Sequence, residues 1–296
     1  MTNLVFVRKK RIKGRQYYYL VATTRQGKIS RKIERYLGLH PPSQKDLSRY
    51  AQEYDRIKEF LSQKEKDLRE IKEAYTHRLR NASADDKRRL ETDLITRFTY
   101  NTNRIEGSTL TFKDTKMLLE EEISPREKPI RDVNEAENHK KAFLHMKECL
   151  DKPITREFIL EMHRILKENV SEDAGSFRTA QVTVGRIVPV RHDMIEQEIQ
   201  NLITWHKKNK SMHPVELACT FHALFERIHP FFDGNGRVGR LLLNFILMRA
   251  GFPCMVIQNK NRIRYYRSLW HADRGNYLPL VKYICAEIEN ERKQFM

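Results

Sequence analysis

The sequence lacks several features that would each indicate a particular class of protein. Its longest apolar run, around residues 241–248, is far shorter than the ~20 residues that a membrane-spanning helix needs. The amino terminus has no apolar segment ahead of a small-residue cleavage site, so we expect no signal peptide and a cytoplasmic location. Four scattered cysteines without a CxxC pair argue against structural zinc and for reduced thiols: Cys149, Cys219, Cys254 and Cys285.

Acidic residues are almost absent from the first 40 positions, although the chain as a whole is 32% charged and carries a formal charge of +17. Residues 1–40 contain 11 Lys and Arg but one acid, Glu34, whereas the rest contains 45 bases and 38 acids. This concentration of positive charge favours an anionic partner, either nucleic acid or an acidic protein surface. A basic surface that is simply solvated is the alternative interpretation.

The pattern of apolar residues predicts a mainly α fold preceded by a small antiparallel β meander. Short β-branched and aromatic stretches at residues 4–9, 16–24 and 28–36 predict the meander, and the prolines at 41 and 42 end it. A long charged helix follows as far as a break at residues 81–85, and further helices then succeed one another, apart from a short hairpin around Gly185. We therefore divide the chain into residues 1–40, 41–86 and 87–296.

The titratable and glycine residues that could carry chemistry are concentrated in residues 228–240, IHPFFDGNGRVGR. Gly234 and Gly236 bracket Asn235, so the backbone there can turn tightly and approach a ligand. A helix follows at once, and the free N–H groups and dipole of its first turn attract anions, most naturally phosphate. Arg237 and Arg240 share one face of that turn and can hold successive phosphates.

Two further side chains complete this loop. A neutral His229 beside a phosphate can take a proton from an incoming hydroxyl, and Asp233 is a hard oxygen ligand suited to Mg²⁺. The combination fits transfer of a phosphorus-centred group to a hydroxyl, and it is not a P-loop, because the P-loop lysine is missing. Taken alone, Asp233 also fits a helix N-cap, and His222 on the preceding helix fits a buried core histidine.

HPFFDGNGRVGR resembles the signature of the Fic family, HPF-x-(D/E)-GNGR-x-x-R, and matches it at every fixed position. The resemblance continues upstream through the pattern AxxxHxxFxxIHPF, downstream through Tyr265-Tyr266 and residues 272–277, and back to about Thr96. It implies a Fic-type helical core with a short β-hairpin flap. It also implies transfer of AMP from ATP to a Ser, Thr or Tyr hydroxyl of a target protein, with Mg²⁺.

The resemblance also implies a role for each matched position. His229 would be the general base and Asp233 the Mg²⁺ ligand. The anion hole around the α- and β-phosphates would be formed by Gly234, Asn235 and Gly236. Arg237 would hold the transferred or β-phosphate, and Arg240 would hold the γ-phosphate. Residues 182–190 resemble the flap that aligns the target backbone by strand addition. Tyr266 would border the adenine pocket, or else pack as an ordinary core aromatic.

Residues 100–107, YNTNRIEG, resemble the inhibitory motif (S/T)xxxE(G/N) of one Fic subclass, with Thr102, Glu106 and Gly107 at the fixed positions. That subclass keeps its inhibitory helix before the catalytic core, so we expect such a helix near residues 97–107. Glu106 would pair with Arg240 in place of the γ-phosphate, and ATP could then bind only in a pose that prevents in-line attack. An exposed glutamate at a helix end is the alternative.

Other functions remain open on the sequence. A Fic protein of this kind could remove AMP instead of adding it, or transfer another group such as UMP or phosphocholine. Residues 17–38 faintly resemble the N-terminal region of some transposases, and basic residues interleaved with aromatics could bind nucleic acid in a regulator. A homodimer is also compatible with the resemblance, because Fic proteins often dimerise.

Overall fold

The computed structural model describes residues 4–12, 15–26, 29–38, 41, 43–185 and 188–294, which form three strands and ten α-helices. In chain order these are β1 (Leu4–Ile12), β2 (Arg15–Gln26), β3 (Ile29–Gly38), α1 (Gln44–Asn81), α2 (Ala84–Ile105), α3 (Phe112–Glu120), α4 (Ile130–Glu148), α5 (Arg156–Lys167), α6 (Ile195–Lys208), α7 (Pro214–Ile228), α8 (Asn235–Arg249), α9 (Arg262–Asp273) and α10 (Leu278–Glu291). The expected mainly α fold with a preceding meander is thus confirmed.

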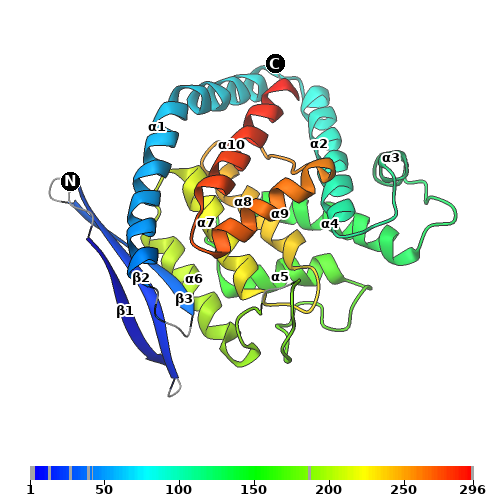
Figure 1. Cartoon of the computed structure of the whole chain (residues 1–296). Coiled ribbons are helices and arrows are strands. Elements are labelled where there is room, and N and C mark those ends of the chain that lie inside the picture. The colour runs from blue at the N-terminus through cyan, green and yellow to red at the C-terminus, as the bar shows by residue number, and fades with distance from the viewer. Residues whose placement is uncertain are drawn as a thin grey trace.

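The meander is one antiparallel sheet in the order β1-β2-β3, and it lies at the edge of the helical body (Figure 1). Side chains alternate between its two faces. On β1, Arg8 and Lys10 are half-buried, whereas Lys9 and Arg11 are exposed. The connecting residues 13–14 and 27–28, and positions 39, 40 and 42 of the expected proline stop, lie outside the described residues.

Helix α1 buries one stripe of apolar side chains at helical spacing: Ile57, Leu61, Leu68 and Ile71. This helix contacts the sheet at one end and packs along α10, so it connects the amino-terminal sheet to the last α-helix (Figure 1). The break expected at residues 81–85 is present: α1 ends at Asn81 and α2 begins at Ala84. Ser83 caps α2 by accepting a hydrogen bond from the Asp86 N–H at 3.1 Å. The division at residues 41–86 stays a proposal, since α1 packs directly on the last part of the chain.

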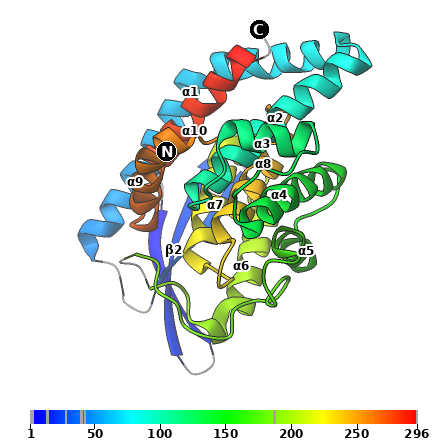
Figure 2. The same cartoon turned by 90° about the vertical axis from the view of Figure 1, so that its right-hand side faces the viewer.

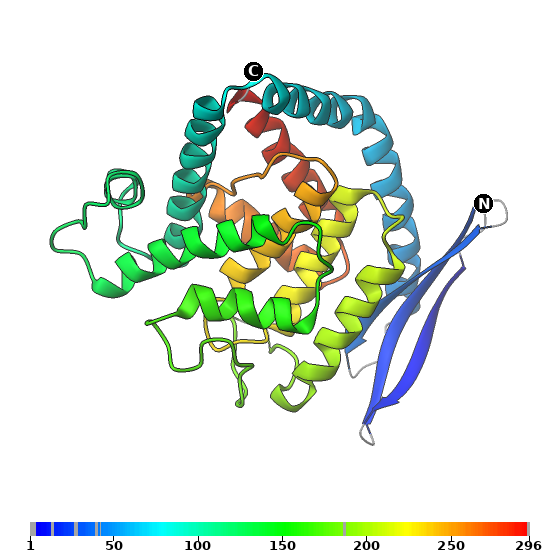
Figure 3. The ribbon, with the colours of Figure 1, turned by 180° about the vertical axis from the view of Figure 1, so that it is seen from behind.

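Helix α8 lies at the centre of the helical body, where α7, α4, α5 and α2 contact it (Figures 2 and 3). A helix that is apolar all round must be buried, and the run from Leu241 to Leu247 is almost inaccessible to solvent. The exception in that run, Asn244, exchanges two hydrogen bonds with the Met255 backbone. The amino end of α8, which carries the glycine and arginine residues of the signature, is therefore fixed by packing on several sides.

The segment expected to form a hairpin around Gly185 is a loop, with Val184 as the one bridge residue among positions 182–185 and 188–190. The side chain of Gln181 joins its two arms by donating to the carbonyls of Val182 and Pro189 at 3.2 and 3.4 Å. A proline has no N–H to donate to a ladder, which explains why a side chain closes the loop there. Residues 186 and 187 at the tip lie outside the described residues.

No helix in the described part of the chain is both long and apolar enough to cross a bilayer. All four cysteines, which lie in the described part of the chain, are buried and form no disulfide there.

Candidate active site

His229 stands at the end of α7, in a backbone conformation that ends the helix. Its φ of 50° is left-handed, its N–H still donates to the Phe225 carbonyl at 2.9 Å, and Pro230 prevents a further turn. Burial lowers the pKa of His229 to about 4, outweighing a hydrogen bond with the Glu226 backbone that acts to raise it. The imidazole is therefore neutral at pH 7 and able to accept a proton.

The loop between α7 and α8 is held by its own side chains. Phe231 is fully buried and stacks on the ring of His163, with 3.7 Å between the ring centroids. Asn235 accepts from the Phe231 N–H at 2.9 Å and donates to its carbonyl at 2.8 Å. The side chain of Asn235 thus fixes the loop, and only the backbone of this residue is left for the expected anion hole.

The two glycines of the loop are required for different reasons. Gly234 has a φ of 84° and caps α8, so it supplies the turn that the sequence predicted. Gly236 already lies within α8 and makes no second turn. A Cβ at Gly236 would overlap the carboxylate of Glu106 and approach Arg240 Nη1 to 2.9 Å. Gly236 is therefore needed so that α2 can approach the start of α8.

Arg240 is 1% exposed and pairs with the end of α2, as the inhibitory motif implied. Its Nη2 lies 2.6 Å from Glu106 Oε1, and its Nε donates to Thr102 Oγ1 at 2.7 Å. Nη2 also reaches the Thr102 carbonyl at 3.3 Å. Gly107 follows with a φ of 97°, which ends α2 directly after the glutamate. The structure thus brings together Thr102, Glu106 and Arg240, which are far apart in the sequence.

Arg237 is equally buried but points to different acids. Its Nη1 lies 2.7 Å from Glu135 Oε2 on α4, and its Nη2 lies 3.4 Å from Asp233 Oδ1. Its Nε is buried and has no hydrogen-bond partner among the described residues. An unsatisfied donor on a buried cation is costly, so this edge of the guanidinium is suited to an anionic ligand.

Asp233, the expected metal ligand, is surrounded by cations. Its Oδ2 lies 2.6 Å from Lys167 Nζ and 2.8 Å from Arg131 Nη2, and its Oδ1 accepts from the Gly234 N–H at 2.6 Å. Burial acts to raise the pKa of Asp233, but Arg237 and Lys167 lower it well below its usual range. The carboxylate is therefore ionised at neutral pH.

The residues present fit a magnesium ion that arrives with a nucleotide. Mg²⁺ takes one or two protein carboxylates and completes its shell with phosphate oxygens and water. The side chain of Asp233 is 46% exposed and offers one such carboxylate. The described part of the chain contains no group of three acids, histidines or cysteines that could hold a metal ion by itself. Arg131 and Lys167 both pair with Asp233 Oδ2, so a metal ion at this oxygen would compete with both cations.

Four residues of this site were missed from the sequence because no local motif marks them: Arg131, Glu135, Lys167 and Arg178. The first three lie on α4 and α5: Arg131 and Lys167 contact Asp233, and Glu135 contacts Arg237. Arg178 is 2% exposed and donates to the carbonyls of His229 and Ala180, each at 2.8 Å, and to that of Val190. It therefore ties both arms of the flap loop to the backbone of the predicted base.

The aromatic residues beside the site take two roles. Tyr266 is 44% exposed next to the end of α2, with its hydroxyl 3.5 Å from the Ile105 carbonyl, and burial followed by the charge of Glu106 raises its pKa to about 12. Tyr265 is fully buried and shares a 2.6 Å hydrogen bond with His222. The interpretation of His222 as a core histidine is confirmed, and Tyr266 keeps an open face where an adenine pocket was expected.

A neutral histidine, a carboxylate and two buried guanidinium groups lie around one helix start in a helical fold, an arrangement suited to binding phosphate. The chain belongs to the Fic/DOC family, whose model matches residues 153–247. It is 31% identical to the solved structure of Fic-1 from C. elegans, with a TM-score of 0.69, over 79% of this chain and 71% of that one. A Fic-domain-containing signaling protein from Bacteroides thetaiotaomicron gives 26% identity and a TM-score of 0.70, over 77% and 95% of the two chains.

Among curated proteins, the chain is 34% identical over 239 residues to protein adenylyltransferase fic-1 of Caenorhabditis briggsae. The match covers 78% of this chain and 46% of that protein, so the chain spans about half the length of the curated relatives it matches.

Proposed function

We propose that this chain is a protein adenylyltransferase that transfers AMP from ATP to a Ser, Thr or Tyr hydroxyl of a target protein. The observation that carries the proposal is the pair of buried guanidinium groups, Arg237 and Arg240, at the start of α8 close to a neutral His229. The relatives named protein adenylyltransferases support it.

In this reaction the loop binds the triphosphate and His229 moves one proton. The imidazole takes the proton of the target hydroxyl while the hydroxyl oxygen attacks the α-phosphorus of ATP. A new O–P bond forms, the bond from the α-phosphorus to the oxygen that bridges to the β-phosphate breaks, and pyrophosphate leaves. Arg237 and the backbone of residues 234–236 hold the α- and β-phosphates, and Arg240 holds the γ-phosphate. Mg²⁺, held through Asp233, would supply charge neutralisation to the phosphates.

The same contacts make the enzyme autoinhibited. Glu106 accepts a hydrogen bond from Arg240 Nη2, the donor that the γ-phosphate would use, and the negative charge of Glu106 repels that phosphate. Release therefore requires that Glu106 leave Arg240. The expected consequence is that the isolated chain transfers AMP slowly.

The test is labelling by [α-³²P]ATP with Mg²⁺ for wild type, Glu106→Gly and Glu106→Gly with His229→Ala. We expect labelled protein, either the chain itself or a lysate target, to increase in the single variant and to disappear in the double variant. Unlabelled UTP and CTP as competitors check that the transferred group is AMP. Labelling that persists without His229 would remove that residue from its role, and no gain in Glu106→Gly would remove the inhibitory role of Glu106.

Removal of AMP is the second candidate, and one observation favours it. The Glu106 side chain is 28% exposed at the mouth of the site, where a carboxylate could orient a water molecule instead of blocking ATP. Incubation with an AMP-modified target separates the two activities. Release of AMP by wild type, lost in Glu106→Gly, would establish hydrolysis and contradict transfer as the main activity.

A further inference from the structure

Helix α9 presents an exposed outer face beside the candidate active site. The helix packs on α7 and α10 with buried residues on its inner side. We propose that its outer face binds the target protein through an acidic segment that lies near the acceptor hydroxyl, an inference that rests on the proposed transfer of AMP. The residues of this α9 face recur at helical spacing and are all exposed: Ile263, Tyr266, Arg267, Trp270 and the capping residue Arg274.

Three large apolar side chains of the α9 face meet solvent. Ile263 is 66% exposed, Tyr266 44% and Trp270 46%. A single exposed apolar residue is ordinary, but a row of them on one side of a helix indicates an interaction surface. Tyrosine, tryptophan and arginine are also the residues that carry most of the binding energy at protein interfaces. The α9 face therefore has the composition of a protein-binding surface.

The charge of the α9 face is positive and is not neutralised within the described part of the chain. Arg267 on the face and Arg262 at its edge form no ion pair and no side-chain hydrogen bond among the described residues. The one acid of the helix, Asp273, is already paired with Arg227 and Arg274, at 3.8 and 3.9 Å. An acidic segment of a partner would give both free arginines the opposite charge that this chain does not supply.

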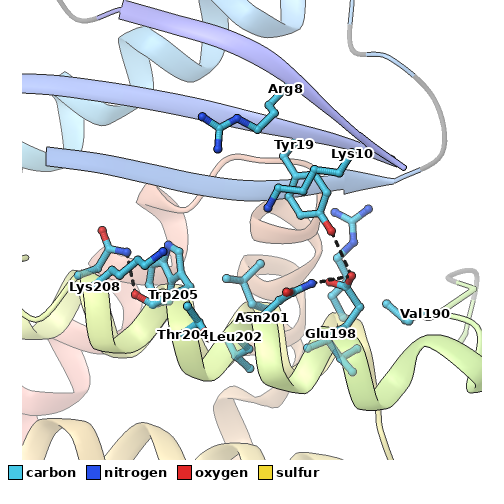
Figure 4. Close-up of a pocket in the computed structure, with 14 residues that line it drawn as sticks. Arg8, Lys10, Tyr19, Val190, Glu198, Asn201, Leu202, Thr204, Trp205 and Lys208 are labelled. Atoms are coloured by element: carbon cyan, nitrogen blue, oxygen red, sulfur yellow. Dashed lines mark hydrogen bonds between the residues drawn. The ribbon is translucent and has the colours of Figure 1, made fainter. Parts of the chain in front are cut away.

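The basic residues between the sheet and α6 differ, because they already have partners in this chain. Lys10 Nζ lies 4.3 Å from the centroid of the Tyr19 ring, and the Tyr19 hydroxyl donates to Glu198 at 3.2 Å (Figure 4). Burial raises the pKa of Glu198, and the charges of Lys10 and Arg227 act to lower it. These cations thus help to fasten the sheet to α6, and positive charge there does not indicate a ligand.

The α9 face begins at the mouth of the candidate active site. The Tyr266 hydroxyl lies 3.5 Å from the Ile105 carbonyl at the end of α2. Glu106, the next residue, is close enough for its charge to act on both Tyr266 and His229. A segment bound along α9 therefore leads towards the proposed base, where the acceptor hydroxyl must arrive.

The shape of the α9 face favours a peptide segment over single-stranded nucleic acid. A helix rises 1.5 Å per residue, so the face is about 16 Å long and matches about five residues of extended chain. Its most exposed apolar side chain, Ile263, is aliphatic and offers no ring on which a base could stack. One side of the Trp270 ring is covered by Arg274, whose guanidinium carbon lies 3.8 Å from the ring centroid. An acidic segment with one apolar side chain fits these features.

Fluorescence anisotropy tests binding to the full chain without ATP. The probe is a fluorescein-labelled peptide rich in glutamate, with one leucine followed by Ser, Thr and Tyr as acceptors. The comparison probes are the same peptide with glutamine in place of glutamate, and an oligothymidylate of equal charge. Arg262→Ala with Arg267→Ala removes the free cations of α9. Arg78→Ala with Arg80→Ala is the matched control, because these arginines are exposed in the last turn of α1 and form no ion pair among the described residues.

We expect the glutamate peptide to bind at least about tenfold tighter than the glutamine peptide. The α9 pair should weaken its binding about tenfold, and the control pair should change it by less than about twofold. Ile263→Asp should weaken it several-fold, and it should not disturb folding because this side chain is largely exposed. Equal binding of the two peptides, equal loss with both arginine pairs, or no effect of Ile263→Asp would overturn the proposal. Tighter binding of oligothymidylate that depends on the α9 pair would assign the face to nucleic acid and overturn it too.

Transfer of AMP to the same peptide separates this proposal from the proposed function. With Glu106→Gly as the enzyme, the α9 pair should raise the KM for the peptide about tenfold and leave kcat and the KM for ATP within about twofold. If the peptide is labelled with an unchanged KM, the docking proposal fails and AMP transfer stands. If the peptide binds as expected but neither the peptide nor the chain is labelled, the proposed function fails and the α9 face remains a binding surface for an acidic partner.

Discussion

Glu106 Oε1 lies 2.6 Å from Arg240 Nη2, where the end of α2 meets the start of α8. The guanidinium is 1% exposed, and it also donates from Nε to Thr102 Oγ1, one turn earlier on α2. Burial raises the cost of leaving any of these groups without a partner. The contact therefore couples the position of α2 to the charge that the proposed γ-phosphate site presents.

Thr102→Val should weaken autoinhibition without touching Glu106. Valine keeps the shape of threonine but removes the acceptor for Arg240 Nε, a hydrogen bond to a charged group worth about 1.5–3 kcal/mol. We expect AMP labelling above wild type but below Glu106→Gly, together with a lower midpoint of urea unfolding. Thr102→Ser restores the hydroxyl and should behave as wild type; a Thr102→Val variant as silent as wild type would show that Thr102 does not orient Arg240.

Gly236→Ala should be energetically coupled to Glu106. The added methyl overlaps the Glu106 carboxylate, so it should destabilise the wild-type chain by about 1–3 kcal/mol. In a Glu106→Gly background the carboxylate is gone, and the cost should fall by about 1 kcal/mol or more. Urea unfolding of the four proteins measures this. Gly251→Ala, where a φ of 83° makes any side chain costly, is the control and should cost the same in both backgrounds.

The local part of this site follows from the sequence because local rules determine it. Pro214 and the His229-Pro230 pair delimit α7, because proline is favoured in the first helical turn and prevents the helix from continuing at its other end. Helix α8 begins at Asn235, two residues earlier than expected, because a single left-handed glycine, Gly234, completes the turn. The second glycine was misread as part of the turn, since its purpose, the approach of Glu106, depends on another helix.

The cation cluster around Asp233 could not be predicted for the same reason. Lys167 and Arg131 reach the carboxylate from 66 and 102 residues away in the chain, and ordinary helical spacing explains both residues without any site. Nothing within α4 or α5 distinguishes a lysine that faces the loop from one that faces solvent. The pair between Glu106 and Arg240 was predictable only because a family resemblance marked both residues.

Arg131→Ala should strengthen metal binding. Arg131 is 63% exposed and competes for Asp233 Oδ2, and exposed pairs of this kind contribute about 0.2–1 kcal/mol. We therefore expect a roughly two- to fivefold tighter affinity for Mn²⁺ in the presence of ADP, measured by isothermal titration calorimetry. Lys141→Ala removes the same charge from the same helix, α4, but there the lysine pairs with Glu168, so it should change nothing. Equal or weaker affinity in Arg131→Ala would show that the arginine does not compete with the ion.

The rate of AMP transfer should show no histidine inflection near neutral pH. The active form of a general base is unprotonated, and burial lowers the pKa of His229 to about 4 from its ordinary value near 6.5. The base form is then complete throughout pH 5.5–7.5 and is lost only as pH falls towards 4. Labelling by Glu106→Gly at saturating Mg²⁺ should be nearly flat over that interval. A one-proton fall centred near pH 6.5 would contradict the lowered pKa.

Arg178→Lys should separate the flap from nucleotide binding. Arg178 donates to the carbonyls of His229, Ala180 and Val190, and lysine cannot reach all three from one position. Two carbonyls then lose their donor, so the free energy of unfolding should fall by about 2–4 kcal/mol. The arginines that we propose hold ATP, Arg237 and Arg240, are fixed by contacts with α4 and with the end of α2. We therefore expect labelling in the Glu106→Gly background to fall at least about tenfold, with little change in ATP affinity by calorimetry.

The matched control is Arg191→Lys in the same segment. The side chain of Arg191 is 41% exposed and pairs with Asp193, so stability and labelling should stay close to those of the parent. If Arg178→Lys lowered stability and left both labelling and ATP affinity intact, Arg178 would be a structural residue alone. A parallel loss of ATP affinity would place its effect on the anion loop instead. A selective loss of transfer follows only if the carbonyl of His229 and the two arms of the flap must be held together for the imidazole to reach the target hydroxyl.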